Sequence, residues 1–128
     1  MNKLNIEKMI IHAMENLDDN HKIVKNNEID SKYFGYISAF GPSVIQSGLL
    51  QTIAFYCSKS EDKKHIIDLM EETLKKAKLI ETTKDLLTYV RETLNSKEFA
   101  NRSVLKNKIL DSCIACKLAM KTYKKKDD

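Results

Sequence analysis

The stretch YFGYISAFGPSVIQSGLLQTIAFYCSK, from Tyr33 to Lys59, decides the fold because it is the longest apolar segment of the 128-residue chain. Its one charged residue is Lys59, and it holds all three glycines and the only proline. A segment so poor in charge is typical of a protein core or a partner interface. Apolar residues recur in it at spacings of three and four, which favours helix. These residues are Phe34, Ile37, Phe40, Leu49, Ile53 and Tyr56.

The pair Gly41-Pro42 interrupts this pattern. Proline lacks a backbone amide and biases its predecessor away from helix, yet it suits a first helical turn. The sequence therefore predicts that one helix ends near Phe40 and another begins at Pro42. Gly48 either breaks this second helix or lets another backbone approach closely. We also expect Phe55 to anchor the core, because large aromatic side chains are usually buried.

On the N-terminal side, apolar residues at helical spacing predict an amphipathic helix from Lys3 to about Lys25. They are Ile6, Ile10, Ala13, Met14, Leu17 and Val24. The run from Asn26 to Asp30 then reads as a helix stop and a connection.

On the C-terminal side, Ser58 or Ser60 is expected to cap a long helix, and Thr82 with Asp85 a shorter one. The apolar rows of these helices are Ile66, Met70, Leu74 and Ala77, then Leu86, Val90 and Leu94. A last helix, from Lys97 or Ser103 toward Tyr123, is expected to bury Leu105, Ile109, Cys113, Cys116, Met120 and Tyr123. The tail from about residue 124 is expected to fray. Together these patterns predict an all-α fold, a single-domain bundle of five or six helices over residues 1–128.

Charge and composition narrow the class of protein. The net charge is +4, and the basic excess lies in residues 59–128, where 17 basic side chains face 12 acidic ones. This bias suits contact with phosphates, although a solvated lysine-rich surface explains it equally well. No apolar run approaches the length of a membrane span, and acidic residues accompany the first apolar run, unlike in a signal peptide. We therefore expect a cytoplasmic protein without membrane contact.

The sequence offers no constellation typical of an enzyme. It contains no phosphate-binding glycine loop and no nucleophile elbow, and the three histidines have no acidic partner at a diagnostic spacing. The one motif with chemistry of its own is Cys113-Ile114-Ala115-Cys116. Two thiols one helical turn apart can form half a zinc site or a redox pair, but two further ligands are lacking. We interpret them as packing residues and expect no catalytic activity, metal or cofactor.

The central stretch also resembles a known family. The residues that carry the likeness are Pro42, Ile45, Gly48-Leu49, Gln51-Thr52, Ala54-Phe55 and Ser58-Lys59. They resemble the signature of the small subunit of the type III-B CRISPR (Cmr) RNA-targeting complex, with Ser47 where asparagine is usual. The resemblance implies a non-catalytic helical subunit, stacked in several copies where guide RNA and target RNA pair. Its implied partners are copies of itself, a backbone subunit and a large polymerase-like subunit. The alternative is a generic helical protein-interaction or regulatory module without nucleic-acid binding.

Because the resemblance places the subunit beside the target strand, we expect it to contact RNA phosphates independently of sequence. Lysines that border apolar helix faces are the best candidates, since a packed stem holds the ammonium group in place. They are Lys22, Lys25, Lys59, Lys63, Lys64, Lys106, Lys117, Lys121 and Lys124. Gln46, Ser47 and Gln51 are expected to add neutral hydrogen bonds.

Overall fold

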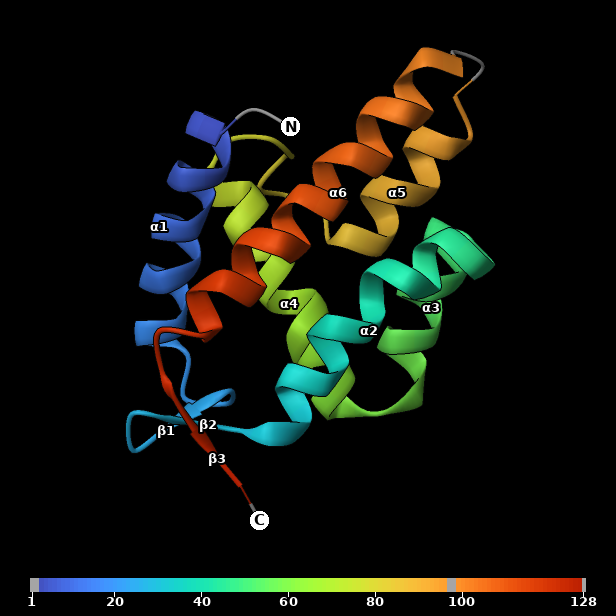
Figure 1. Cartoon of the computed structure of the whole chain (residues 1–128). Helices are drawn as coiled ribbons and strands as arrows, with labels where there is room; N and C mark the ends of the chain where they lie inside the picture. The colour runs from blue at the N-terminus through green and yellow to red at the C-terminus, as the bar shows by residue number, and fades with distance from the viewer. Residues whose placement is uncertain (1–2, 97–98, 128) are drawn as a thin grey trace.

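The computed structural model describes residues 3–96 and 99–127, and these contain six helices and three short strands (Figure 1). In chain order they are α1 (Lys3–Asp19), β1 (Val24–Lys25), β2 (Glu28–Asp30), α2 (Ser31–Ser47), α3 (Leu49–Lys59), α4 (Glu61–Lys76), α5 (Leu86–Leu94), α6 (Phe99–Met120) and β3 (Lys124–Lys126). The predicted bundle of five or six helices is confirmed, and the small sheet is an addition to it. The last helix begins at Phe99; Lys97, one of its two expected starts, lies outside the described residues.

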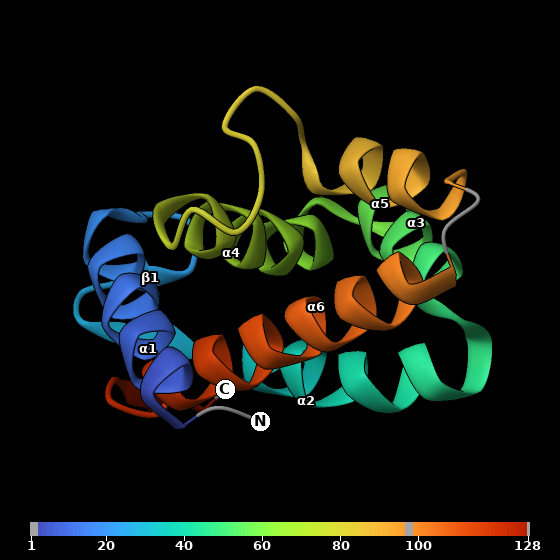
Figure 2. The same cartoon turned by 90° about the horizontal axis from the view of Figure 1, so that it is seen from above.

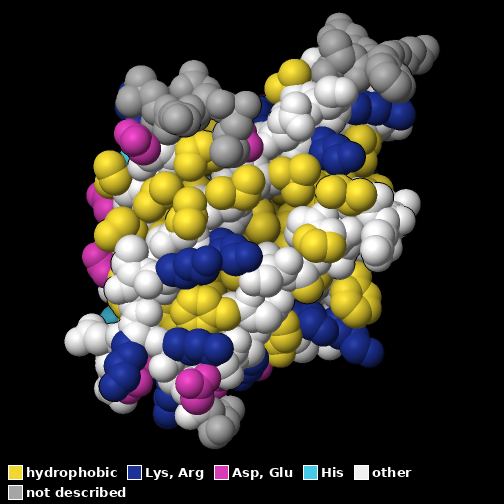
Figure 3. Space-filling model, viewed as in Figure 1, with side chains coloured by type: hydrophobic (Ala, Val, Ile, Leu, Met, Phe, Trp, Pro, Cys, Tyr) yellow, Lys and Arg dark blue, Asp and Glu magenta, His cyan; other side chains and the backbone are white. Residues whose placement is uncertain are grey.

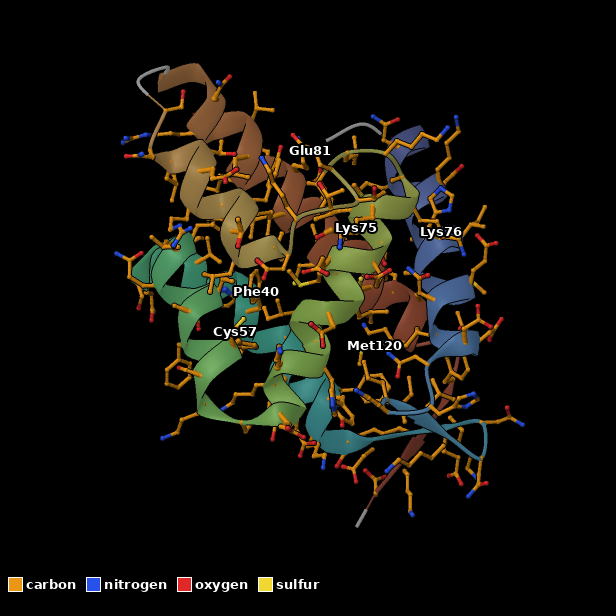
Figure 4. All side chains as sticks on the ribbon, turned by 180° about the vertical axis from the view of Figure 1, so that it is seen from behind. Phe40, Cys57, Lys75, Lys76, Glu81 and Met120 are labelled. Atoms are coloured by element: carbon orange, nitrogen blue, oxygen red, sulfur yellow. The ribbon has the colours of Figure 1, made fainter. Side chains whose placement is uncertain are left out.

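Helix α6 organises the bundle. It crosses the molecule diagonally and packs against α1, α2, α4 and α5 (Figures 1 and 2). Phe40 of α2 lies toward α3, where its ring meets that of Tyr56 edge-on at 5.4 Å, and Met120 of α6 lies toward α1 (Figure 4). Both side chains are fully buried. The first, central and last helices therefore all contribute to the core, as their apolar spacing predicts.

Within the central stretch, the helix break falls at Gly48 and not at Gly41-Pro42. Helix α2 continues through Pro42 to Ser47, which contradicts the predicted end near Phe40. Proline deprives the carbonyl four residues earlier of its helical donor, but that carbonyl belongs to Ser38, an exposed residue that water can solvate. Gly48 has a φ of 100°, a backbone conformation that residues with a side chain rarely adopt.

Substitution of two glycines tests this assignment. Gly48→Ala is expected to cost about 1–3 kcal/mol of stability, because a residue with a side chain is strained at this positive φ. Gly35→Ala is the matched control: Gly35 lies inside α2 with no atom near its Cβ position, and alanine should stabilise the helix by about 0.5–1 kcal/mol. Urea unfolding of both variants measures the difference, and equal effects would contradict the break at Gly48.

Phe55 does not anchor the core, contrary to expectation. Its side chain is 49% exposed, and Ile45 is 71% exposed, whereas Leu49 is buried. The buried stripe of α3 is Leu49, Ile53 and Tyr56, and Phe55 lies one residue, or 100°, away from Tyr56 around the helix. Of the residues that carry the family resemblance, Pro42, Ile45 and Phe55 therefore face outward, and Gly48 and Leu49 form the helix junction.

The predicted first helix is shorter than expected. It ends at Asp19, because the Asn20 side chain accepts hydrogen bonds from the backbone amides of Lys22 and Ile23 and turns the chain. Lys22 and Lys25 therefore lie outside α1. Residues 26 and 27, both asparagines with positive φ, then form the two-residue turn of a β1–β2 hairpin.

The C-terminal tail is paired, whereas the sequence predicts fraying. Lys124–Lys126 forms β3, which lies parallel to β2 with Lys124 opposite Glu28 and Lys126 opposite Asp30. Tyr123 reaches Asp18 of α1 with its hydroxyl group. Helix α6 ends at Met120 and the chain turns over residues 121–123, so Lys124 lies in β3 and not on the last helix.

Candidate nucleic-acid interface

Three lysines share one side of α6 and are free of acidic neighbours on it. Lys106 and Lys117 lie in α6, and Lys121 directly follows it, with its backbone amide donating to the carbonyl oxygen of Lys117. Lys106, Lys117 and Lys121 fall within about 60° of one another at 100° per residue. Lys106 and Lys121 are exposed and Lys117 is half-buried. In the described part of the chain none of the three pairs with a carboxylate, although other lysines do, such as Lys76 with Glu15 and Lys84 with Glu92. We call these three residues the α6 lysine row.

The α6 lysine row borders an exposed apolar surface. On the face that α6 crosses, hydrophobic side chains form a band over α1 and α6, and Lys or Arg side chains lie below it (Figure 3). The exposed members on these helices are Ile11, Met14, Val104, Ile114 and Leu118. We call them the α1–α6 apolar band. Cations beside exposed aliphatic groups suit a surface that contacts phosphates and protein at once.

A second group of lysines surrounds a cavity of about 400 Å³ at the small sheet. Lys22 and Lys25 line it, as expected, and the structure adds Lys32, Lys126, His21 and His65. Carboxylates share this cavity, however. Asp62 Oδ2 lies 2.8 Å from Lys32 Nζ, and this hydrogen bond lowers the pKa of the Asp62 carboxyl group. Glu28 and Asp30 also line the cavity, so its cations are partly neutralised.

Tyr33 forms the buried wall of the same cavity. Its hydroxyl oxygen lies 3.1 Å from His65 Nδ1, and 3.3 Å from both Asp62 Oδ1 and the carbonyl oxygen of Lys22. Burial, assisted by the negative charge of Asp62, raises the pKa of Tyr33 to about 12. The phenol therefore stays protonated and ties α2, α4 and the hairpin entrance together.

The third group of predicted lysines lies where α3 meets α4, and its three members have different neighbours. Lys59 is exposed in the last turn of α3. Lys63 Nζ lies over two aromatic rings, 5.2 Å from the centroid of Phe55 and 5.4 Å from that of Tyr36. Lys64 lines a cavity together with Asp68, Glu71 and Asp85, an acidic setting that repels phosphate.

The neutral candidates lie around the junction of α2 and α3. Gln46 and Ser47 are exposed at the end of α2, and Gln51 is exposed in the first turn of α3. Ser47 and Gln51 line one cavity with Phe55. The residues predicted to contact RNA therefore do not form one continuous surface.

Residues 7–123 match the family model described as CRISPR-associated protein (Cas_Cmr5). The chain belongs to the Cmr5 family. Cmr5 is the small, non-catalytic subunit of the type III-B Cmr complex of antiviral CRISPR defence. The search of curated proteins and the search of solved structures each found no match.

The cysteine pair of this Cmr5 protein joins helices. Cys113 donates to the carbonyl oxygen of Ile37 in α2 at 3.5 Å, and Cys116 donates to Thr73 Oγ1 in α4 at 3.6 Å. Burial raises the pKa of Cys113 to about 11 and that of Cys116 to about 12, which disfavours the thiolate that metals and redox chemistry require. Within residues 3–96 and 99–127, no group of three or more His, Cys, Asp and Glu side chains could hold a metal ion.

These thiols predict an alkaline limit of stability. An unfolded chain releases thiol protons near pH 9, whereas the folded chain holds them to about pH 11–12, so stability is unaffected below pH 9 and falls above it. At pH 10.5 we expect a loss of roughly 2 kcal/mol for each buried thiol. Urea unfolding at pH 8 and 10.5 measures it. Cys113→Ala with Cys116→Ala should be less pH-dependent than wild type; an identical pH dependence would contradict the burial of these thiols.

Sequence reasoning missed Lys32, Lys126, His21 and His65 as neighbours of Lys22. Lys126 falls in the tail that the sequence predicts to fray, and no local pattern shows that it pairs beside Asp30, 96 positions earlier.

Among the described residues of this Cmr5 protein, no helix is long and apolar enough to cross a membrane.

Proposed function

We propose that this Cmr5 subunit contacts RNA phosphates through the α6 lysine row while its α1–α6 apolar band packs against neighbouring subunits of the Cmr complex. The observation that carries the proposal is the side of α6 on which Lys106, Lys117 and Lys121 stand without a carboxylate partner in the described chain. An unpaired ammonium group needs no internal ion pair broken before it binds phosphate. The lysines of the sheet cavity, and Lys64 at the α3–α4 corner, share cavities with carboxylates that neutralise them in part.

The partners we propose are guide RNA and target RNA, the backbone and large polymerase-like subunits, and copies of this chain, all in the cytoplasm. Three phosphate contacts give one copy only a modest affinity. Several copies held in register along one strand multiply that affinity without any new contact. Phosphate contacts carry no sequence information, so the subunit should act alike on unrelated targets.

A triple substitution tests the proposal in the assembled complex. Lys106, Lys117 and Lys121 replaced by alanine should weaken target binding equally for two unrelated sequences. The plot of log association constant against log salt should become shallower by about 2 per copy, at roughly 0.7 for each lost single-strand contact. The control replaces Lys8, Lys76 and Lys84 by alanine, which removes the same charge; Lys76 and Lys84 already pair with carboxylates.

Filter binding over 50–300 mM salt measures both slopes. An unchanged slope for the α6 variant, with the subunit still in the complex, would contradict the RNA contact and leave a helical protein-interaction module. Equal changes for both variants would show that net charge, and not the α6 lysine row, governs binding.

A further inference from the structure

A cavity of about 360 Å³ between α2 and α3 has a lining without charge. Its residues are Ser43, Ser47, Gln51, Thr52, Phe55 and Tyr56. Side chains four apart lie on the same side of a helix, so Ser43 and Ser47 form one wall and Gln51 and Phe55 the other. The next residue in the second row is Lys59, which is exposed at the end of α3.

Phe55 presents an aromatic face to solvent at this cavity. The ring is 49% exposed, and the Lys63 ammonium group lies over it at 5.2 Å from the centroid. Lys63 itself does not line the cavity. The cation–π contact holds the ring in its outward position. This arrangement leaves an aromatic surface available for stacking.

Some polar groups in the lining already make hydrogen bonds within the protein, and others make none. The Thr52 hydroxyl donates to the carbonyl oxygen of Gly48 at 2.8 Å, and the Tyr56 hydroxyl donates to that of Tyr36 at 2.7 Å. Within the described chain, the side chains of Ser43, Ser47 and Gln51 make no hydrogen bond. Two hydroxyl groups and one amide therefore offer donors and acceptors beside the ring.

We propose that this cavity binds one unpaired RNA base, stacked on Phe55 and hydrogen-bonded at its edge by Gln51, with Lys59 on the adjoining phosphate. A neutral lining suits an uncharged ring with mixed donors and acceptors, and a nearby ammonium group suits the phosphate that accompanies each base. A cationic peptide side chain would lose its hydration in this lining without gaining a counter-charge. The inference rests on the proposed RNA contact and adds a base site to its phosphate sites.

Abasic target strands test the base site in the assembled complex. One target nucleotide at a time is made abasic, which removes a base and keeps its phosphate, and target affinity is measured for wild type and Phe55→Leu. At the position whose base occupies the cavity, the abasic penalty should be about 5- to 150-fold smaller in Phe55→Leu, the range for loss of one base–aromatic stack. Ile45→Ala is the control, since Ile45 is exposed on α2 but does not line the cavity.

Three outcomes would overturn the base site. They are an abasic penalty that is the same in wild type and Phe55→Leu at every position, an equal change in Ile45→Ala, and a Phe55→Leu subunit that folds but no longer enters the complex. The last outcome would show that a neighbouring protein occupies the cavity. Failure of the proposed phosphate contact is distinguishable, because abasic strands keep every phosphate and the salt slope of the α6 variant reports on that contact alone.

Discussion

Phe40→Ala is expected to remove a large share of the protein's stability. Phe40 is fully buried, and its ring packs edge-on against Tyr56 where α2 meets α3. Truncation of a buried phenylalanine costs about 3–5 kcal/mol, through lost transfer free energy and the cavity left behind. A domain of this size has about 5–15 kcal/mol of stability in total, so the loss removes a fifth of that stability or more. Urea unfolding followed by circular dichroism measures the loss.

Phe55→Ala is the matched control for Phe40. The same chemical change on the half-exposed Phe55 ring, with loss of its Lys63 contact, should cost only about 1 kcal/mol. If the two variants lost equal stability, or if Phe55→Ala lost more, the placement of α2 and α3 described here would be wrong.

Ile114→Gln combined with Leu118→Gln is expected to keep the subunit out of the Cmr complex. Both side chains are exposed, one turn apart on α6, and belong to the α1–α6 apolar band. Truncated hot-spot residues cost about 2 kcal/mol or more each at an interface, so the pair should weaken assembly about a thousandfold. Glutamine is a good helix former and adds no charge, so α6 and its lysine row should remain intact. Copurification with a tagged backbone subunit measures the loss.

Leu79→Gln provides the comparison for the α6 pair. Leu79 is an exposed leucine in the segment between α4 and α5, outside the α1–α6 apolar band, and its substitution should leave assembly unchanged. A double variant that folds and still copurifies at the wild-type level would show that the band is not an interface.

Local signals predicted much of the fold. The Ser60 side chain accepts from the Lys63 amide, so Ser60 and not Ser58 caps α4. The Asp85 side chain accepts from the Thr88 amide, so the cap of α5 is Asp85 alone and not Thr82. Helical spacing also identified the buried stripe Leu49, Ile53 and Tyr56. The error at Phe55 arose because its residue type was given more weight than its position off that stripe.

The sheet and the lysine groups depended on contacts that no local pattern carries. Residues 124–126 pair with residues 28–30, which are 96 positions earlier in the sequence. Because of this pairing Lys124 lies outside the α6 lysine row, and Lys126 lines the same cavity as Lys22. Lys64 was a reasonable phosphate candidate until the fold placed Asp68, Glu71 and Asp85 around it. Which lysines lack carboxylate partners is a property of the tertiary structure and not of the sequence.

The most direct measurement is an electron-microscopy structure of the assembled Cmr complex with target RNA bound, at a resolution that shows side chains. We predict the ammonium groups of Lys106, Lys117 and Lys121 at about 3 Å from RNA phosphate oxygens, with Ile114 and Leu118 covered by a neighbouring subunit. If instead the α6 lysine row faced open solvent or lay buried against protein while RNA ran along another face, the proposed interface would be wrong.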